Sequence, residues 1–153
     1  MKLAEALQER ADLNTKIEDL RKRINNAMLV QEGEEPAEDP EKLLQDLDSA
    51  VERLGYLMGA INLTNCRTKV DGVTLTEMIA RKDALMLKIS AYKDLVYTAG
   101  QSANRARGTE IRIKSLLKAS ELQKAVDEAA GEARKLNNTL QETNWKTKLI
   151  EKA

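Results

Sequence analysis

The sequence contains no histidine and a single cysteine, Cys66. Histidine is the side chain that most often serves as a general base or a metal ligand near neutral pH, so its absence removes both roles. One cysteine cannot form an intrachain disulfide. A catalytic triad or zinc centre that depends on histidine is therefore excluded, and we expect no metal and no cofactor.

Aromatic residues and net charge are also scarce. Only 3% of residues are aromatic and none is phenylalanine, so the core must consist of Leu, Ile, Val, Met and Ala. The 25 Lys and Arg residues balance the 25 Asp and Glu residues, so no overall field draws the protein toward nucleic acid or an anionic membrane. Either partner would require a local charged patch.

Long apolar runs are missing, and no stretch reaches the length that spans a membrane. The first ten residues include acids where a signal peptide needs an uninterrupted apolar core. These absences predict a cytoplasmic protein without a membrane partner. A chain of 153 residues that is 42% hydrophobic and 33% charged is typical of one folded domain over residues 1–153.

Apolar residues recur at alternating spacings of three and four over four stretches, which predicts four helices. The first stretch shows the heptad pattern most clearly, with Leu3, Ala6, Leu13, Ile17, Leu20, Ile24 and Ala27 at a and d positions and Arg10 as the exception. The expected helices cover about residues 2–30, 40–61, 75–99 and 121–143. We predict a mainly α fold of two long antiparallel hairpins, four-helix and coiled-coil-like, with a small β element at one end.

Between the first two helices, residues 31–39 form an acidic segment that contains five acids, no base and Gly33. The ligand spacing of an EF-hand is absent, so a solvated loop is expected rather than a calcium site. Asp39 is then an N-cap and Pro40 a first-turn residue, which predicts the start of the second helix.

Three further segments favour β structure. Asp71-Gly72 predicts a tight hairpin turn within residues 68–75, because a type I′ turn needs positive φ at both central positions. Residues 109–115 alternate between apolar and charged side chains, and the tail 144–150 alternates again. Since an isolated hairpin is marginally stable, we expect these segments to pair, with Trp145 packed against them as a buried anchor.

The second helix carries more apolar width than one partner helix covers. Its main stripe consists of Leu44, Leu47, Val51, Leu54, Met58 and Ile61, and a second set, Leu43, Ala50 and Leu57, lies beside it. Gly55 and Gly59 favour close approach of another helix, since glycine otherwise costs a helix about 1 kcal/mol. We therefore predict a homo-oligomer, a dimer or larger, with the second set forming the extra surface.

Several ordered sequence blocks give nearly the whole chain a resemblance to a known family. The blocks are Met1-Lys2-Leu3-Ala4-Glu5-Ala6-Leu7-Gln8-Glu9-Arg10, Gln31-Glu32-Gly33-Glu34, Ile61-Asn62-Leu63-Thr64-Asn65, Asp71-Gly72-Val73-Thr74-Leu75-Thr76-Glu77, Arg81-Lys82-Asp83 and Asn144-Trp145. Together they resemble the septicolysin-like family of bacterial proteins. That family is largely uncharacterised, so the resemblance implies no defined activity, and without a signal peptide or membrane-length segment we do not carry over a cytolysin activity.

Polar residues of these blocks gather around the expected β segments. Two interpretations are open: they cap helices and strand ends, or they form a small site in which arginines bind an anion and a tryptophan stacks on the ligand. The candidate ligand-binding residues are Arg81, Asp83, Arg107, Glu110, Asn144 and Trp145. No nucleophile with an adjacent base is visible, so no catalytic residue is assigned.

Three functions remain compatible with the sequence. The first is a self-associating structural or scaffold protein, as the apolar width of the second helix indicates. The second is a nucleic-acid-binding protein that uses the basic stretch 105–118, although no aromatic platforms for base stacking interleave with it. The third is binding of a small molecule or anion at the polar cluster, with an enzyme site shared between subunits ranked below the rest.

Overall fold

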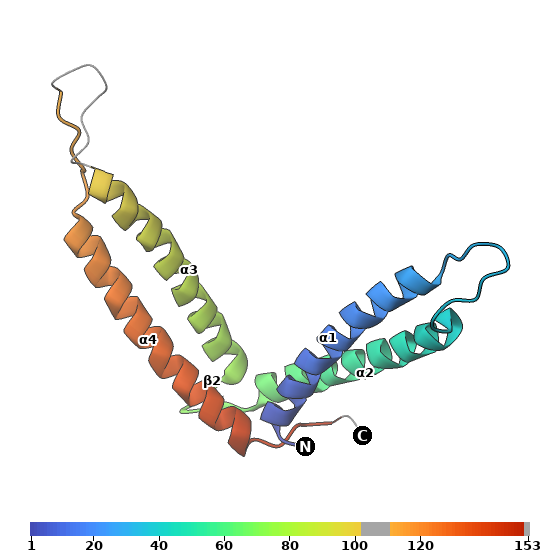
Figure 1. The fold of residues 1–153 in the computed structure, drawn as a ribbon. Coiled ribbons are helices and arrows are strands. Elements are labelled where there is room, and N and C mark those ends of the chain that lie inside the picture. The colour runs from blue at the N-terminus through green and yellow to red at the C-terminus, as the bar shows by residue number, and fades with distance from the viewer. Residues whose placement is uncertain (102–110, 152–153) are drawn as a thin grey trace. The chain divides into compact units, whose positions relative to one another are not determined.

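The computed structural model describes residues 1–101 and 111–151, which form four helices and one two-stranded antiparallel sheet (Figure 1). In chain order the elements are α1 (Leu3–Ala27), α2 (Pro40–Arg67), β1 (Lys69–Val70), β2 (Val73–Thr74), α3 (Leu75–Gly100) and α4 (Ala119–Lys146). The predicted fold class, mainly helical with a small β hairpin, is confirmed. None of the helices in the described ranges is both long and apolar enough to cross a membrane.

Contacts divide the chain into two units, whereas the sequence predicts one domain. The first unit contains residues 1–69 and 143–153, and the second contains residues 70–142. The chain passes from one unit to the other within the β hairpin and again near the end of α4.

In the first unit α1 and α2 lie side by side as an antiparallel hairpin (Figure 1). Leu20 and Ala27 of α1 form a buried cluster with Leu43 of α2, and Ile24 and Leu47 pack against it. These residues come from the apolar stripes of the two helices, so hydrophobic burial holds this end of the hairpin together.

The acidic connection between α1 and α2 is formed as the sequence predicts, although α1 ends at Ala27, three residues earlier than expected. The Asp39 carboxylate accepts a hydrogen bond from the Glu41 N–H at 3.0 Å, and Pro40 is the first residue of α2. Arg23 of α1 pairs with Glu38, so one of the five acids is neutralised by the preceding helix.

The C-terminal tail pairs with the N-terminus instead of adding a strand to the hairpin. Lys148 forms an antiparallel bridge with Lys2. The Leu3 N–H donates to the Thr147 carbonyl at 2.9 Å, and the Leu149 N–H donates to the Met1 carbonyl at 2.9 Å. The residues before Leu3 are extended and leave their backbone groups free for this pairing, which the sequence does not indicate.

Both α2 and α4 run further than the sequence predicts. α2 reaches Arg67, so Cys66 lies exposed in its last turn rather than in a loop. Thr64 in this added turn is fully buried, and its hydroxyl donates to the Ala60 carbonyl at 2.7 Å while it accepts from the Ile150 N–H at 2.8 Å. The tail thus gives this part of α2 a partner that keeps it helical.

In the second unit α3 and α4 run antiparallel (Figure 1). Ile89 of α3 forms a buried cluster with Val126, Ala129 and Ala133 of α4, and the small alanines let the two helices approach. The Thr74 hydroxyl caps α3 by accepting from the Glu77 N–H at 3.1 Å.

The β hairpin turns at Asp71 and Gly72, whose φ angles are +52° and +82°. Positive φ at both central residues is what a type I′ turn requires, and Asp-Gly tolerates it. The strand expected at 109–115 is different: residues 109 and 110 lie outside the described residues, and residues 111–115 contain only a single bridged position, Arg112. Residues 111–115 are all exposed, so the alternation there has no buried face that would fix a strand, and α4 begins at Ala119, two residues earlier than predicted.

Candidate functional site

The six candidate ligand-binding residues have three different outcomes. Arg81 and Asp83 lie on α3 in the second unit, whereas Asn144 and Trp145 lie in the last turn of α4 in the first unit. The other two candidates, Arg107 and Glu110, lie outside the described residues.

Trp145 is not the buried anchor that the sequence predicts. Its surface is 62% exposed. α4 continues through Lys146, so the tryptophan belongs to a helix rather than to an extended tail. Leu149 is the tail residue that is buried.

Arg81 is held by a neighbouring helix. Its guanidinium pairs with the carboxylate of Glu132 on α4. A groove of about 440 Å³ lies beside Arg81, between the hairpin turn, the start of α3 and α4, and it also contains the acids Asp71 and Glu77. An anion beside Arg81 would meet the negative charges of Glu132, Asp71 and Glu77. The ion pair between α3 and α4 therefore accounts for Arg81 without a ligand.

The face of α2 that is exposed is not the one that the sequence predicts. Leu43, Ala50 and Leu57, the expected extra surface, are 5%, 4% and 0% exposed. They are the residues that bury α2 in the first unit, and Leu43 contacts α1 in the cluster described above. The expectation that these residues form an intermolecular surface is therefore wrong.

The residue that follows each of these three buried residues on α2 is exposed. Leu44, Val51 and Met58 are 49%, 50% and 47% exposed. Their spacing of seven residues places them on one side of α2, since seven residues advance a helix by almost two whole turns. We call these three residues the α2 stripe.

The two glycines of α2 are open on the outside. A Cβ atom added to Gly55 or Gly59 would meet no atom within 4 Å among the described residues. Gly55 follows Val51 by four positions and precedes Met58 by three, so it lies within the α2 stripe. The close helix approach that the glycines favour is thus not made by the described part of the chain, and the backbone at Gly55 is accessible to another molecule.

Polar contacts fix the neighbourhood of the α2 stripe. Arg53 donates to both carboxylate oxygens of Glu9 on α1, at 2.7 and 2.9 Å, and this hydrogen bonding lowers the pKa of Glu9. The Tyr56 hydroxyl donates to Glu151 of the tail at 3.0 Å, which raises the pKa of Tyr56. These contacts tie α2 to α1 and to the tail, and they leave the α2 stripe uncovered.

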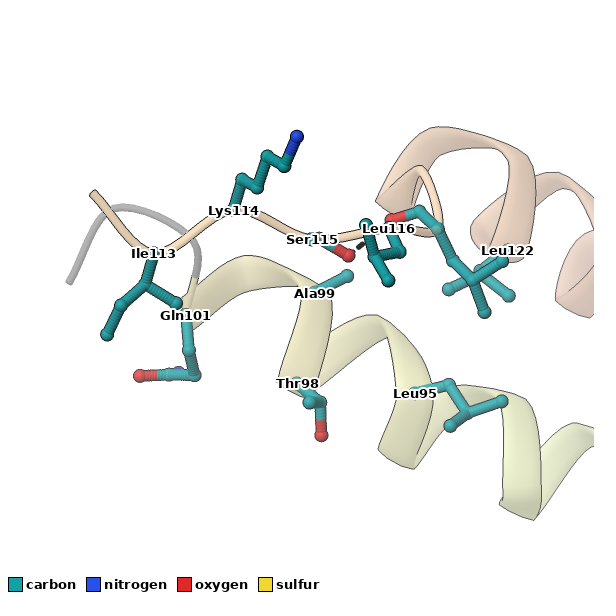
Figure 2. Close-up of a pocket in the computed structure, with 10 residues that line it drawn as sticks. Leu95, Thr98, Ala99, Gln101, Ile113, Lys114, Ser115, Leu116 and Leu122 are labelled. Carbon is teal, nitrogen blue, oxygen red and sulfur yellow. Dashed lines mark hydrogen bonds between the residues drawn. The ribbon is translucent and has the colours of Figure 1, made fainter. Parts of the chain in front are cut away.

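A second uncovered apolar surface lies at the far end of the α3–α4 hairpin. Figure 2 shows Leu116 and Leu122 pointing toward the end of α3, where Leu95 and Ala99 lie, while Lys114 points the other way. These side chains line a groove of about 410 Å³ that also includes Ile113 and Leu117. Leu116 is 89% exposed, so the apolar rim of the groove is left in contact with solvent.

Comparisons with known proteins extend over the whole fold. A family model described as a family of unknown function (DUF6847) matches residues 10–149. A crystal structure described as that of a functionally unknown conserved protein from Corynebacterium diphtheriae is similar, with 34% sequence identity and a TM-score of 0.91 over 98% of this chain and 99% of that chain. No curated protein matches the chain. These similarities name neither a ligand nor a reaction.

Proposed function

The chain belongs to the DUF6847 family of unknown function, and we propose that this member is a structural protein that associates with further copies of itself through the α2 stripe. The observation that carries the proposal is the half-exposure of Leu44, Val51 and Met58 on one side of a helix whose other apolar side is already buried. Apolar side chains aligned in this way are typical of a helix that packs against a second partner.

The expected gain from covering the α2 stripe is moderate. Full burial of a leucine, valine or methionine contributes about 1.5 to 3 kcal/mol. Covering the exposed half of three such side chains on each of two copies therefore contributes roughly 4 to 9 kcal/mol before the cost of association is subtracted. That cost is of similar size, so the closeness of the helix contact decides the affinity.

Gly55 supports a close contact, because a partner helix can approach the backbone there without meeting a Cβ atom. When the same surface is used by both copies, the contact has two-fold symmetry and closes after two chains. The proposed assembly is thus a dimer in which the α2 helices of two hairpins pack against each other.

The experiment is size-exclusion chromatography with light scattering on the intact chain. At about 0.5 M salt, which screens contacts between charged surfaces, the wild type should have twice the monomer mass of 17.1 kDa. Leu44→Glu combined with Val51→Glu should return it to a monomer, because each carboxylate would be buried in an apolar contact. Gln45→Glu, on the same turn of α2 at an exposed position, is the matched control and should remain a dimer.

The other interpretations stay predictions. For the nucleic-acid interpretation, a gel shift with salt titration is the test, because phosphate contacts give a steep salt dependence. The proposed dimer does not depend on ligand binding at the polar cluster, on a cytoplasmic location or on the resemblance to the septicolysin-like family.

A further inference from the structure

The α1–α2 hairpin and the α3–α4 hairpin each expose apolar side chains at the end where their two helices are connected. The charged residues at these two ends have opposite sign. The first is the connection after α1, residues 28–35, which we call the acidic tip. Met28, Leu29 and Val30 are 60%, 87% and 49% exposed there. They are followed by three acids and no base, Glu32, Glu34 and Glu35.

The acids of the acidic tip are available to a partner. The other two acids of the connection are already used, since Glu38 pairs with Arg23 and Asp39 caps α2. Within the described ranges, no cation lies within ion-pair distance of the three acids of the tip.

The second end is the groove of about 410 Å³ formed by the last turns of α3, the segment 111–118 and the start of α4 (Figure 2). The segment contains three bases, Arg112, Lys114 and Lys118, and no acid. None of the three bases forms an ion pair with the residues that the structure describes. We call this surface the basic groove.

We propose that the basic groove of one copy binds the acidic tip of a second copy, with Met28, Leu29 and Val30 on the apolar floor and Glu32, Glu34 and Glu35 beside the three bases. This inference rests on the proposed function in that it assumes self-association, but it uses different residues from the α2 stripe. The two surfaces match in both chemistries: the exposed apolar residues of the tip fit an apolar groove, and the three acids that follow them are opposite in charge to the three bases of the segment 111–118 that borders the groove.

The contact joins two unlike surfaces, so in a bound pair one copy still presents a free tip and the other a free groove. Such head-to-tail contacts continue into a ring or an open chain of copies. A dimer formed through the α2 stripe would thereby be extended into a larger assembly.

The test uses sedimentation velocity on chains that all carry Leu44→Glu and Val51→Glu, so that the α2 stripe does not contribute. One variant reverses the tip, with Glu32→Lys, Glu34→Lys and Glu35→Lys. The other reverses the groove, with Arg112→Glu, Lys114→Glu and Lys118→Glu. Circular dichroism confirms that each variant keeps the helical content of its parent.

In low salt the parent should form species larger than a monomer, and each reversed variant alone should sediment at 17.1 kDa. An equimolar mixture should form assemblies in which the two variants alternate, because the intact tip of one fits the intact groove of the other and the reversed tip fits the reversed groove. A chain with both reversals should associate again, since complementarity is restored. At about 0.5 M salt, where the screening length is about 4 Å, association of the parent should weaken at least tenfold.

The proposal is overturned if the mixture stays monomeric in low salt. It is also overturned if the parent is monomeric while both reversals lower its stability, which would place tip and groove in contact within one chain. Binding of the monomeric parent to phosphatidylserine vesicles, lost in the groove variant, would assign the basic groove to a membrane surface instead. A wild-type dimer that persists at about 0.5 M salt would still support the α2 stripe, so the two proposals fail separately.

Discussion

Two neighbouring residues of α2, Leu57 and Met58, should respond very differently to truncation. Leu57 is fully buried and Met58 is 47% exposed. Replacing a buried leucine with alanine costs about 2 to 5 kcal/mol, because the transfer free energy is lost and a cavity remains. Met58→Ala removes a side chain of which about half is already in water, so its cost in a monomer is about 1 kcal/mol or less.

The assay is urea unfolding followed by circular dichroism, at a protein concentration low enough to keep the chain monomeric. With a slope of about 2 kcal/mol per molar urea, Leu57→Ala should lower the unfolding midpoint by roughly 1 to 2.5 M, and Met58→Ala by less than about 0.5 M. At a high protein concentration, where the dimer forms, Met58→Ala should weaken dimerisation more than Leu57→Ala does. Equal shifts in the midpoint for both variants would refute the assignment of the inner and outer faces of α2.

Three further results are expected. Thr64→Val should lower the free energy of unfolding by about 1 to 3 kcal/mol, because the partly buried Ile150 N–H loses its acceptor. Thr64→Ser keeps the hydroxyl and should retain the wild-type stability. If Thr64→Val has the same free energy of unfolding as the wild type, the tail does not depend on this bond. Trp145→Ala should change the free energy of unfolding by about 0.5 kcal/mol or less, as is usual at exposed positions. The tryptophan fluorescence of the wild type should have the emission maximum of an indole in water. A blue-shifted emission that resists quenchers would contradict the exposed placement of Trp145. The lowered pKa of Glu9 means that its pair with Arg53 stabilises the fold fully above the ordinary value of 4.5 and progressively less as the pH falls through the lowered value. Both side chains are partly exposed, so the contribution is at most about 1 kcal/mol. Glu9→Gln should remove this part of the acid dependence, and an identical acid profile would contradict the pairing.

Local signals in the sequence predict several local features of the fold. Asp39 and Thr74 cap helices because short polar side chains can accept a hydrogen bond from the first-turn N–H groups. The Asp71-Gly72 turn is equally local, because its backbone angles are accessible to these two residues. In each case the determining interaction spans only a few residues, so the sequence contains it entirely.

Pairing between distant segments is what the sequence does not determine. The tail alternates as a strand does, but alternation does not indicate which edge it meets, and the edge is the extended N-terminus before α1. The exposed position of Trp145 was not predicted because α4 extends to Lys146, so this residue lies on the helix and not in the tail.

The face of α2 was ambiguous for a geometric reason. Leu43, Ala50 and Leu57 form one row of heptad spacing, and Leu44, Val51 and Met58 form another that is displaced by one residue, about 100° around the helix. Both rows satisfy the pattern of a buried seam, and only the position of α1 distinguishes them. The same ambiguity is what leaves an apolar row available on the outside of the hairpin.

The α2 stripe is tested most directly by the mass of the wild-type chain in solution, compared with that of Leu44→Glu combined with Val51→Glu. Light scattering after size exclusion, at tens of micromolar protein and about 0.5 M salt to screen contacts between charged ends, should give twice 17.1 kDa for the wild type and 17.1 kDa for the variant. A wild type that elutes as a 17.1 kDa monomer under these conditions would contradict the account.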